Sequence, residues 1–277
     1  MPTSGPSPPA KRSSRRRSKL LQEILQGLAI GLIGGGASGL LGVSSGGFLV
    51  ALAVLFMGLP QYMAQGVSLV AQVPPTSLSG VMQYRRSGHA VPMRWIVLAS
   101  VGFVIGVVAG ALAAGHIAEQ VLRWAYVGYL VLLGLLALTR LRRPREKTSE
   151  SRDVVLDIAA LVGVGIVSGL SSGILGIGGG LAITAILAAG LKVPQHLAQA
   201  LALAVTTLPL TLPAAIVYAR TESLPWLAIA AIVVGLWIGT IAGAKLATMA
   251  SDQTLRRLMP VCIFVMAAFM AWRALHP

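Results

Sequence analysis

Apolar stretches of 18 residues or more recur through this chain of 277 residues, and no other feature limits its fold as strongly. As a helix, each stretch is long enough to cross a hydrocarbon core of about 30 Å. Only 11% of the residues are charged, whereas soluble domains average about 25%. The sequence therefore predicts an all-α membrane protein. The single cysteine, Cys262, excludes a disulfide framework and a CxxC redox pair.

The chain is also an internal duplication. At an offset of 134, residues 38–86 align without a gap with residues 172–220 and share 15 identities. Prolines, glutamines and a tyrosine are among these identities, and an apolar composition does not force such residues to coincide. Internal repeats with the substrate site at their interface are typical of secondary transporters. The duplication therefore favours transport over other membrane functions.

Hydropathy divides each repeat into four spans. We predict about eight transmembrane helices, at residues 24–43, 62–84, 95–114, 121–140, 154–177, 195–219, 226–248 and 256–274. Two apolar segments remain, 48–59 and 181–191, and a helix of such length reaches only about 18 Å. We interpret them as glycine-hinged half-helices or re-entrant elements. If they crossed fully, each repeat would have five spans and the repeats would be inverted.

The charge pattern sets an expected orientation. We divide the chain into a disordered basic cytoplasmic tail (1–20), a first repeat (21–140), a basic cytoplasmic linker (141–153) and a second repeat (154–277). Six Lys and Arg lie in the tail and six in or beside the linker, and basic segments concentrate in the cytoplasm. This favours a plasma-membrane protein with both termini cytoplasmic and parallel repeats. Topology and anionic lipid headgroups explain the net charge of +14, so membrane lipid, not nucleic acid, is an expected partner.

Each repeat contains a break rich in small residues between its first helix and its short apolar segment. The two breaks consist of Ser44, Ser45, Gly46 and Gly47, and of Gly178, Gly179 and Gly180. Irregular backbone at membrane depth is stable only inside protein or beside a cavity. Free N–H groups at a helix N-terminus attract anions without a basic side chain. The breaks are therefore either tight turns or two halves of one anion site.

The second span of each repeat is unusually polar. Its candidate substrate-binding residues are Gln65 and Gln72, with Gln199 and Thr206 at the equivalent positions. Pro75 and Pro209 interrupt the same spans, and proline frees backbone carbonyls one turn earlier. The polar side chains either satisfy those carbonyls and neighbouring groups or form a lining that hydrogen-bonds an anion.

Glycines spaced by four residues form a further pattern. The series are Gly31, Gly35 and Gly39; Gly165, Gly169 and Gly173; Gly102, Gly106 and Gly110; and Gly235, Gly239 and Gly243. Small residues at this spacing let membrane helices approach closely, so we expect helix packing at these positions. Glu23 and Asp157 are equivalent in the two repeats, and we expect both at helix N-termini, which favour acids.

Together these features resemble the sulfite exporter TauE/SafE family of membrane transporters, over about residues 24–275. The resemblance rests on the glycine-rich first helix, the short apolar helix, the duplication, and Pro60 and Pro194, each about 14 residues after a break. It implies about eight spans, made by duplicating a four-span unit, and export of anions such as sulfite and organosulfonates. The first break departs from the second because it has serines where the second has glycines.

The sequence indicates no catalytic chemistry. Residues 169–173 match G-x-S-x-G, but a nucleophile elbow is a strand-to-helix turn with His and acid partners, whereas this segment lies in an apolar helix. The four His are scattered, so no metal or cofactor is expected. We predict a secondary transporter, not an enzyme, whose partner is a small anionic substrate. The alternatives are a permease for another small metabolite and a non-transporting membrane scaffold.

Overall fold

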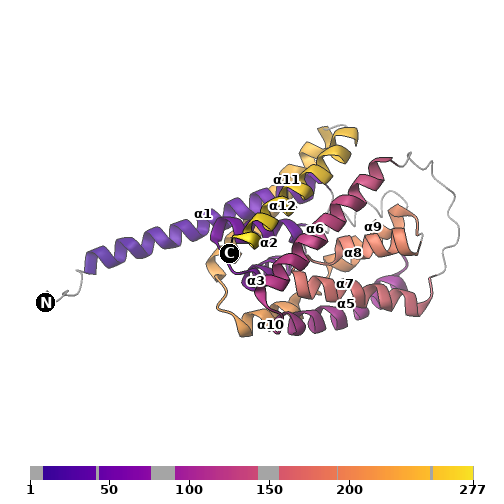
Figure 1. The fold of residues 1–277 in the computed structure, drawn as a ribbon, viewed down its shortest axis with the longest axis horizontal. Helices are drawn as coiled ribbons and strands as arrows, with labels where there is room; N and C mark the ends of the chain where they lie inside the picture. Colours follow the sequence, from indigo (N-terminus) through magenta and orange to yellow (C-terminus); the bar gives the residue numbers. More distant parts are fainter. Residues whose placement is uncertain are drawn as a thin grey trace.

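The computed structural model describes residues 9–41, 44–75, 91–142, 156–191, 193–249 and 252–276, and all regular structure in them is helical. The first repeat supplies α1 (Pro9–Leu41), α2 (Gly46–Met57), α3 (Gln61–Ala71), α5 (Met93–Ala114) and α6 (Glu119–Arg142). The second supplies α7 (Ile158–Leu175), α8 (Gly180–Ala185), its π-helical continuation η1 (Ile186–Gly190), α9 (Gln195–Thr207), α10 (Leu212–Thr221), α11 (Trp226–Met249) and α12 (Asp252–Leu275). Figure 1 shows them interleaved in one bundle.

The helices have the length and the surface of membrane spans. Within the described residues, four are long and apolar enough to cross a bilayer, in α1, α5, α7 and α11, and the pair α9–α10, bent by 51°, adds a fifth if counted as one span. Their outer faces expose large apolar side chains; Val101 is 51% exposed and Ile241 60%. Such faces suit lipid tails rather than water. The predicted all-α membrane fold is confirmed.

Asp157 and Glu23 were both predicted to lie at helix N-termini, and the structure confirms this only for Asp157. Asp157 precedes α7 and its side chain accepts the N–H of Ile158 at 2.8 Å, so this acid caps a helix as expected. Glu23, its equivalent, lies inside α1, which already begins at Pro9. The region predicted to be a disordered tail is therefore helical from Pro9 onward, and Figure 1 shows it projecting from the bundle. Lys, Arg and Leu have high helix propensity, so extending an existing helix outward costs little.

The glycine series join helices from different repeats. α1 packs along α11, and α7 packs along α5, each pair running in the same direction. In the second pair, a Cβ on Gly106 would clash with the carbonyl oxygen of Ile166, and a Cβ on Gly169 with that of Phe103. The first pair repeats this reciprocal pattern through Gly35 and Gly239. Close packing of backbone on backbone, the predicted role of these glycines, is confirmed.

α6 packs against its own counterpart, α12, in the opposite direction. Near the start of α6, Gln120 Nε2 donates a hydrogen bond to the carbonyl oxygen of Ala274 in the last turn of α12, at 2.7 Å. Further along α6, Gly134 faces the ring of Phe264, which precedes Ala274 in α12. Equivalent helices that pack antiparallel are related by an axis perpendicular to their length, in the membrane plane. The repeats are inverted, and the expected parallel arrangement is wrong.

Polar contacts show on which side the first repeat begins and ends. Gln26 in α1 donates to the carbonyl oxygen of Phe56, at the end of α2, at 2.8 Å. After a short turn, the N–H of Gln61 at the start of α3 donates to Glu119 Oε1 at the start of α6, at 3.2 Å. These groups therefore share one side, which we call the terminal side because α12 also ends there (Figure 1). α6, with 24 residues, then rises about 36 Å to the opposite side.

A repeat that begins on one side and ends on the other crosses the membrane an odd number of times. The prediction of four spans per repeat, with tail and linker together in the cytoplasm, is therefore wrong. The reason is α2, a 12-residue helix that returns the chain to the terminal side. Protein encloses most of it, with Leu49, Val50 and Ala53 fully buried, and only its last turn exposes Leu55 and Phe56. A helix that is largely covered by protein does not need the full hydrocarbon length.

Candidate functional site

Both predicted breaks are real interruptions, and they lie against each other. One separates α1 from α2 and the other separates α7 from α8. Ser44 Oγ donates to the carbonyl oxygen of Ile177 at 3.3 Å. A Cβ on Gly46 would lie only 2.5 Å from the carbonyl carbon of Ile177. We call this meeting place of the two breaks the junction; it has the geometry that a site shared between the repeats requires.

The two breaks have different backbones, which explains their different sequences. Gly176, Gly178 and Gly179 have φ of 71°, 78° and 68°, a left-handed conformation that costs other residues about 1–2 kcal/mol each. Gly179 also has no room for a side chain, because a Cβ would clash with the ring of Phe103. Ser45, the equivalent of Gly179, has φ of −67°. Serine is therefore compatible with the first break and not with the second.

α3 contributes the polar side chains at the junction. Ser68 is fully buried. Its Oγ donates to the carbonyl oxygen of Gly176 at 2.7 Å and lies 3.2 Å from the carbonyl oxygen of Gly46. Gln72, one turn later, directs Nε2 to Ser68 O at 3.0 Å and lies 3.4 Å from Gly176 O. Its Oε1 lies 3.4 Å from Ser44 Oγ, which can donate either to this oxygen or to Ile177 O. The Gln72 amide therefore lies between the two breaks.

Gln65, one turn before Ser68 on α3, packs against the end of α7. A Cβ on Gly176 would be 2.7 Å from Gln65 Cα. Tyr218 OH lies 3.2 Å from Gln65 Oε1 and donates to the carbonyl oxygen of Gly173 at 2.7 Å. Gln65 is fully buried and its Nε2 makes no hydrogen bond. Its contacts fix α3 and α10 against α7 beside the second break.

The second repeat contributes less polarity. Thr206 Oγ1 donates to the carbonyl oxygen of Ala202 in its own helix at 2.9 Å, as the interpretation of a self-capped helix predicts. Its methyl group nevertheless faces the junction, 3.3 Å from a Cβ built on Gly180, and Ser44 Cβ is 3.7 Å from the same point. Gln199 lies in the second turn of α9 with a partly buried side chain. Of the predicted polar side chains, Ser44, Gln72 and Thr206 therefore meet at the junction.

α2 begins at the junction without a side-chain cap, because its N-cap residue Ser45 makes no such hydrogen bond. An uncapped N-terminus leaves backbone N–H donors and about half a unit of positive charge. At Gly47, an added Cβ would have no atom within 4 Å, so there is open space beside the first turn. Tyr126 OH donates to the carbonyl oxygen of Gly47 and holds this turn.

The junction can therefore do one kind of chemistry well. Its side chains Ser44, Ser68, Gln72 and Thr206 are neutral, and α2 adds a partial positive charge. Hydroxyl, amide and backbone donors in a largely enclosed place stabilise the oxygens of an anion, because electrostatic attraction is stronger where less water is present. Neutral donors also bind less tightly than a buried cation, which lets a ligand leave again.

Sequence reasoning missed three residues at or beside the junction. They are Ser68, Tyr126 and Tyr218. The comparison of the repeats did not single out Ser68, because its equivalent is Ala202. Its spacing of four from Gln72 nevertheless places both residues on one helix face. Tyr218 is the tyrosine that the duplication conserves, and its equivalent, Tyr84, lies outside the described residues. The signal available in each case was a polar group in an apolar helix.

Comparison with known proteins gives a consistent result. The family model described as "Sulfite exporter TauE/SafE" matches residues 27–270. The chain is 28% identical over 229 residues to the probable membrane transporter protein YdhB of Bacillus subtilis (strain 168), covering 82% of this chain and 88% of that protein. It is also 28% identical over 254 residues to a probable membrane transporter protein of Xylella fastidiosa (strain 9a5c), covering 90% and 92%. No solved structure matches significantly.

Proposed function

Because this chain belongs to the sulfite exporter TauE/SafE family of membrane transporters, we propose that it exports small sulfur-containing oxyanions such as sulfite and organosulfonates, which bind at the junction. The observation that carries this proposal is the contact between the two breaks, with Ser44 Oγ on Ile177 O and the Gln72 amide between them. A site formed by both inverted repeats lies on their axis, where both sides of the membrane can reach it in turn.

The predicted binding residues have distinct roles in this proposal. Ser44, Gln72 and the N–H groups of Gly46 and Gly47 donate to the oxyanion. The glycines 178–180 let the second break approach closely, and Thr206 borders the same space. Gln65 and its equivalent Gln199 support α3 and α9. Without substrate, Gln72 Nε2 is directed to the carbonyl oxygens of Ser68 and Gly176. A bound anion would replace these oxygens as the acceptor of the Gln72 amide.

Export needs no second substrate in this proposal. We propose that both termini lie in the cytoplasm of a plasma-membrane protein, since six Lys and Arg lie in the first 20 residues. The inverted repeats then place the end of α6, where the equally basic linker begins, on the outer side. A monoanion that leaves a negative cytoplasm gains about 2.3 kcal/mol per 100 mV. Sulfite efflux from proteoliposomes should therefore respond to an imposed potassium diffusion potential. Efflux that is insensitive to the potential contradicts this energy source.

The site itself is tested by sulfite efflux from proteoliposomes that contain the Gln72→Ala variant. A hydrogen bond to a charged group contributes about 1.5–3 kcal/mol, so we expect efflux at low sulfite to fall about ten- to hundredfold. Gln26→Ala is the matched control, because it removes a glutamine whose contact with Phe56 is remote from the breaks. If wild type and Gln72→Ala give equal efflux at equal amounts of reconstituted protein, the junction is not the binding site.

A further inference from the structure

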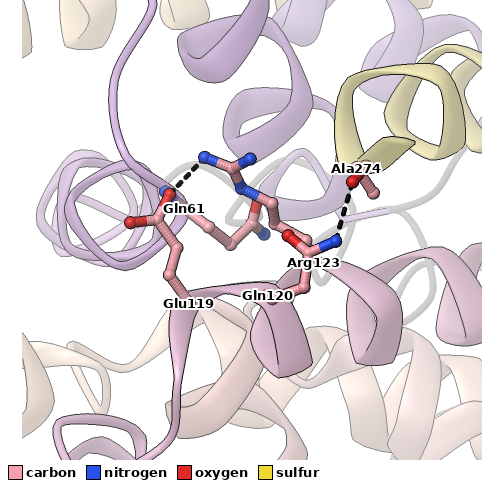
Figure 2. A network of polar contacts seen from close by, with 5 residues as sticks. All are labelled: Gln61, Glu119, Gln120, Arg123 and Ala274. Carbon is pink, nitrogen blue, oxygen red and sulfur yellow. Dashed lines mark hydrogen bonds and ion pairs between the residues drawn. The ribbon is translucent and has the colours of Figure 1, made fainter. Parts of the chain in front are cut away.

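A polar network joins the start of α3 to α6 and α12 on the terminal side. Glu119, the first residue of α6, accepts the N–H of Gln61 at 3.2 Å and pairs with Arg123 Nη2 at 2.5 Å. Beside it, Gln120 donates to the carbonyl oxygen of Ala274. Figure 2 shows these groups together, with the Arg123 guanidinium directed back to the Glu119 carboxylate. One turn of α6 thus holds two other helices.

Glu119 acts as the N-cap that α3 lacks. The residue before α3 is Pro60, which makes no side-chain hydrogen bond to the helix. The first N–H groups of a helix have no partner within it, and a carboxylate at this end also interacts favourably with the helix dipole. Glu119 supplies this carboxylate from another helix. Arg123, with a side chain 20% exposed against 41% for Glu119, holds the carboxylate in place from the more buried side.

The anchored helix is the one that carries the junction's polar groups. Gln65, Ser68 and Gln72 follow Gln61 on α3 and its C-cap, at spacings of three and four residues that share one helix face. A short helix moves as a rigid body, so a shift at its start displaces all three groups. The position of Gln61 relative to α6 therefore controls the geometry of the junction.

The second repeat carries the same residue types at the equivalent positions. The segment Glu119-Gln120-Val121-Leu122-Arg123 corresponds to Asp252-Gln253-Thr254-Leu255-Arg256. The offset here is 133, because the second repeat is one residue shorter between the aligned segment and this point. Gln61, at the start of α3, corresponds to Gln195 at the start of α9. The side chains of this second set lie outside the described residues. Because the repeats are inverted, α12 begins on the side opposite to the terminal side.

We propose that Glu119 and Arg123 form a positioning clamp for α3. This inference rests on the proposed role of the junction. The clamp sets the place of a site-bearing helix and does not touch the substrate. Its release lets α3 shift relative to α6, as alternating access requires. The clamp therefore controls the turnover rate more than the affinity.

The test combines transport with a measurement that needs no substrate. Glu119→Gln removes the charge and its ion pair, and we expect the maximal sulfite efflux rate to fall roughly tenfold, as the loss of a cap implies, with KM changed less than about twofold. Hydrogen exchange of α3 amides should become faster by a similar factor. Glu119→Asp should retain most activity, because the second repeat uses Asp at this position. Glu222→Gln, at the C-cap of α10, is the matched control and should change neither quantity.

The outcomes separate the two proposals. Unchanged α3 exchange in both Glu119→Gln and Arg123→Gln overturns the clamp, whatever the transport result. Faster α3 exchange without any sulfite efflux from the wild type supports the clamp and contradicts the proposed substrate. If Glu119→Gln does not fold, Arg123→Gln is measured instead. Wild-type turnover and wild-type α3 exchange in this variant would overturn the proposal.

Discussion

At the scale of single residues, the junction depends on a few hydrogen bonds between α3 and the breaks. Gln72 was predictable, because an amide in an apolar span needs a reason to be there. The glycines of the second break were predictable as a hinge, but not their left-handed φ, which depends on how α7 meets α8. Ser68 was not predictable from the duplication, since its equivalent is an alanine. Its role arises from a tertiary contact with Gly176.

Ser68→Ala should destabilise the protein, because it leaves the buried carbonyl oxygen of Gly176 without this hydrogen bond. We expect a loss of about 1–3 kcal/mol in the free energy of unfolding. Ser100→Ala is the control, since the buried Ser100 hydroxyl makes no hydrogen bond; this change should be neutral or slightly stabilising. Denaturant unfolding followed by tryptophan fluorescence measures both. Equal effects of the two substitutions would contradict the assigned role of Ser68.

At the scale of elements, glycine spacing predicted close helix packing but not the partners. The four-residue pattern shows which face of α5 or α7 is small. It does not show that the partner helix comes from the other repeat, because both repeats carry the same pattern. The short helix α2 was predicted as an element. Its return to the terminal side was not, because its length suggested an incomplete crossing and its enclosure by protein is not visible in hydropathy.

Gly106→Ala should push α5 and α7 apart, since the new Cβ would meet the carbonyl oxygen of Ile166. We expect a loss of about 1–3 kcal/mol, typical of overpacking. Gly163→Ala places a methyl group on α7 where no atom lies within 4 Å, and it should raise stability by up to about 1 kcal/mol through helix propensity. Thermal unfolding of the purified variants measures the difference. A Gly106→Ala variant as stable as Gly163→Ala would contradict the close packing.

At the scale of the whole molecule, the duplication was predictable and its direction was not. The number of crossings per repeat decides whether the halves are parallel or inverted, so one unrecognised returning helix reversed the conclusion. Two basic segments of equal size predict a single cytoplasmic side for tail and linker. The antiparallel contact of α6 with α12 shows instead that the chain leaves α6 on the side opposite to its C-terminus.

Reporter fusions test this inverted arrangement. Alkaline phosphatase or a fluorescent protein fused after Arg142 should report the opposite side from the same reporter fused after His276. The reason is that α6 ends on the opposite side, whereas α12 ends on the terminal side. A second fusion pair, before α1 and after α12, should agree with each other. If the fusions after Arg142 and His276 report the same side, the repeats are parallel, and the junction shared by inverted repeats is contradicted.

Direct binding of radiolabelled sulfite to the purified protein tests most closely whether the two breaks hold an anion. The account predicts saturable binding to the wild type and to Gln26→Ala, and a loss of at least about tenfold in affinity when Ser44→Ala and Gln72→Ala are combined. The double variant should keep its thermal stability within a few degrees, because both side chains are only partly buried. Wild-type affinity in the double variant would contradict the account.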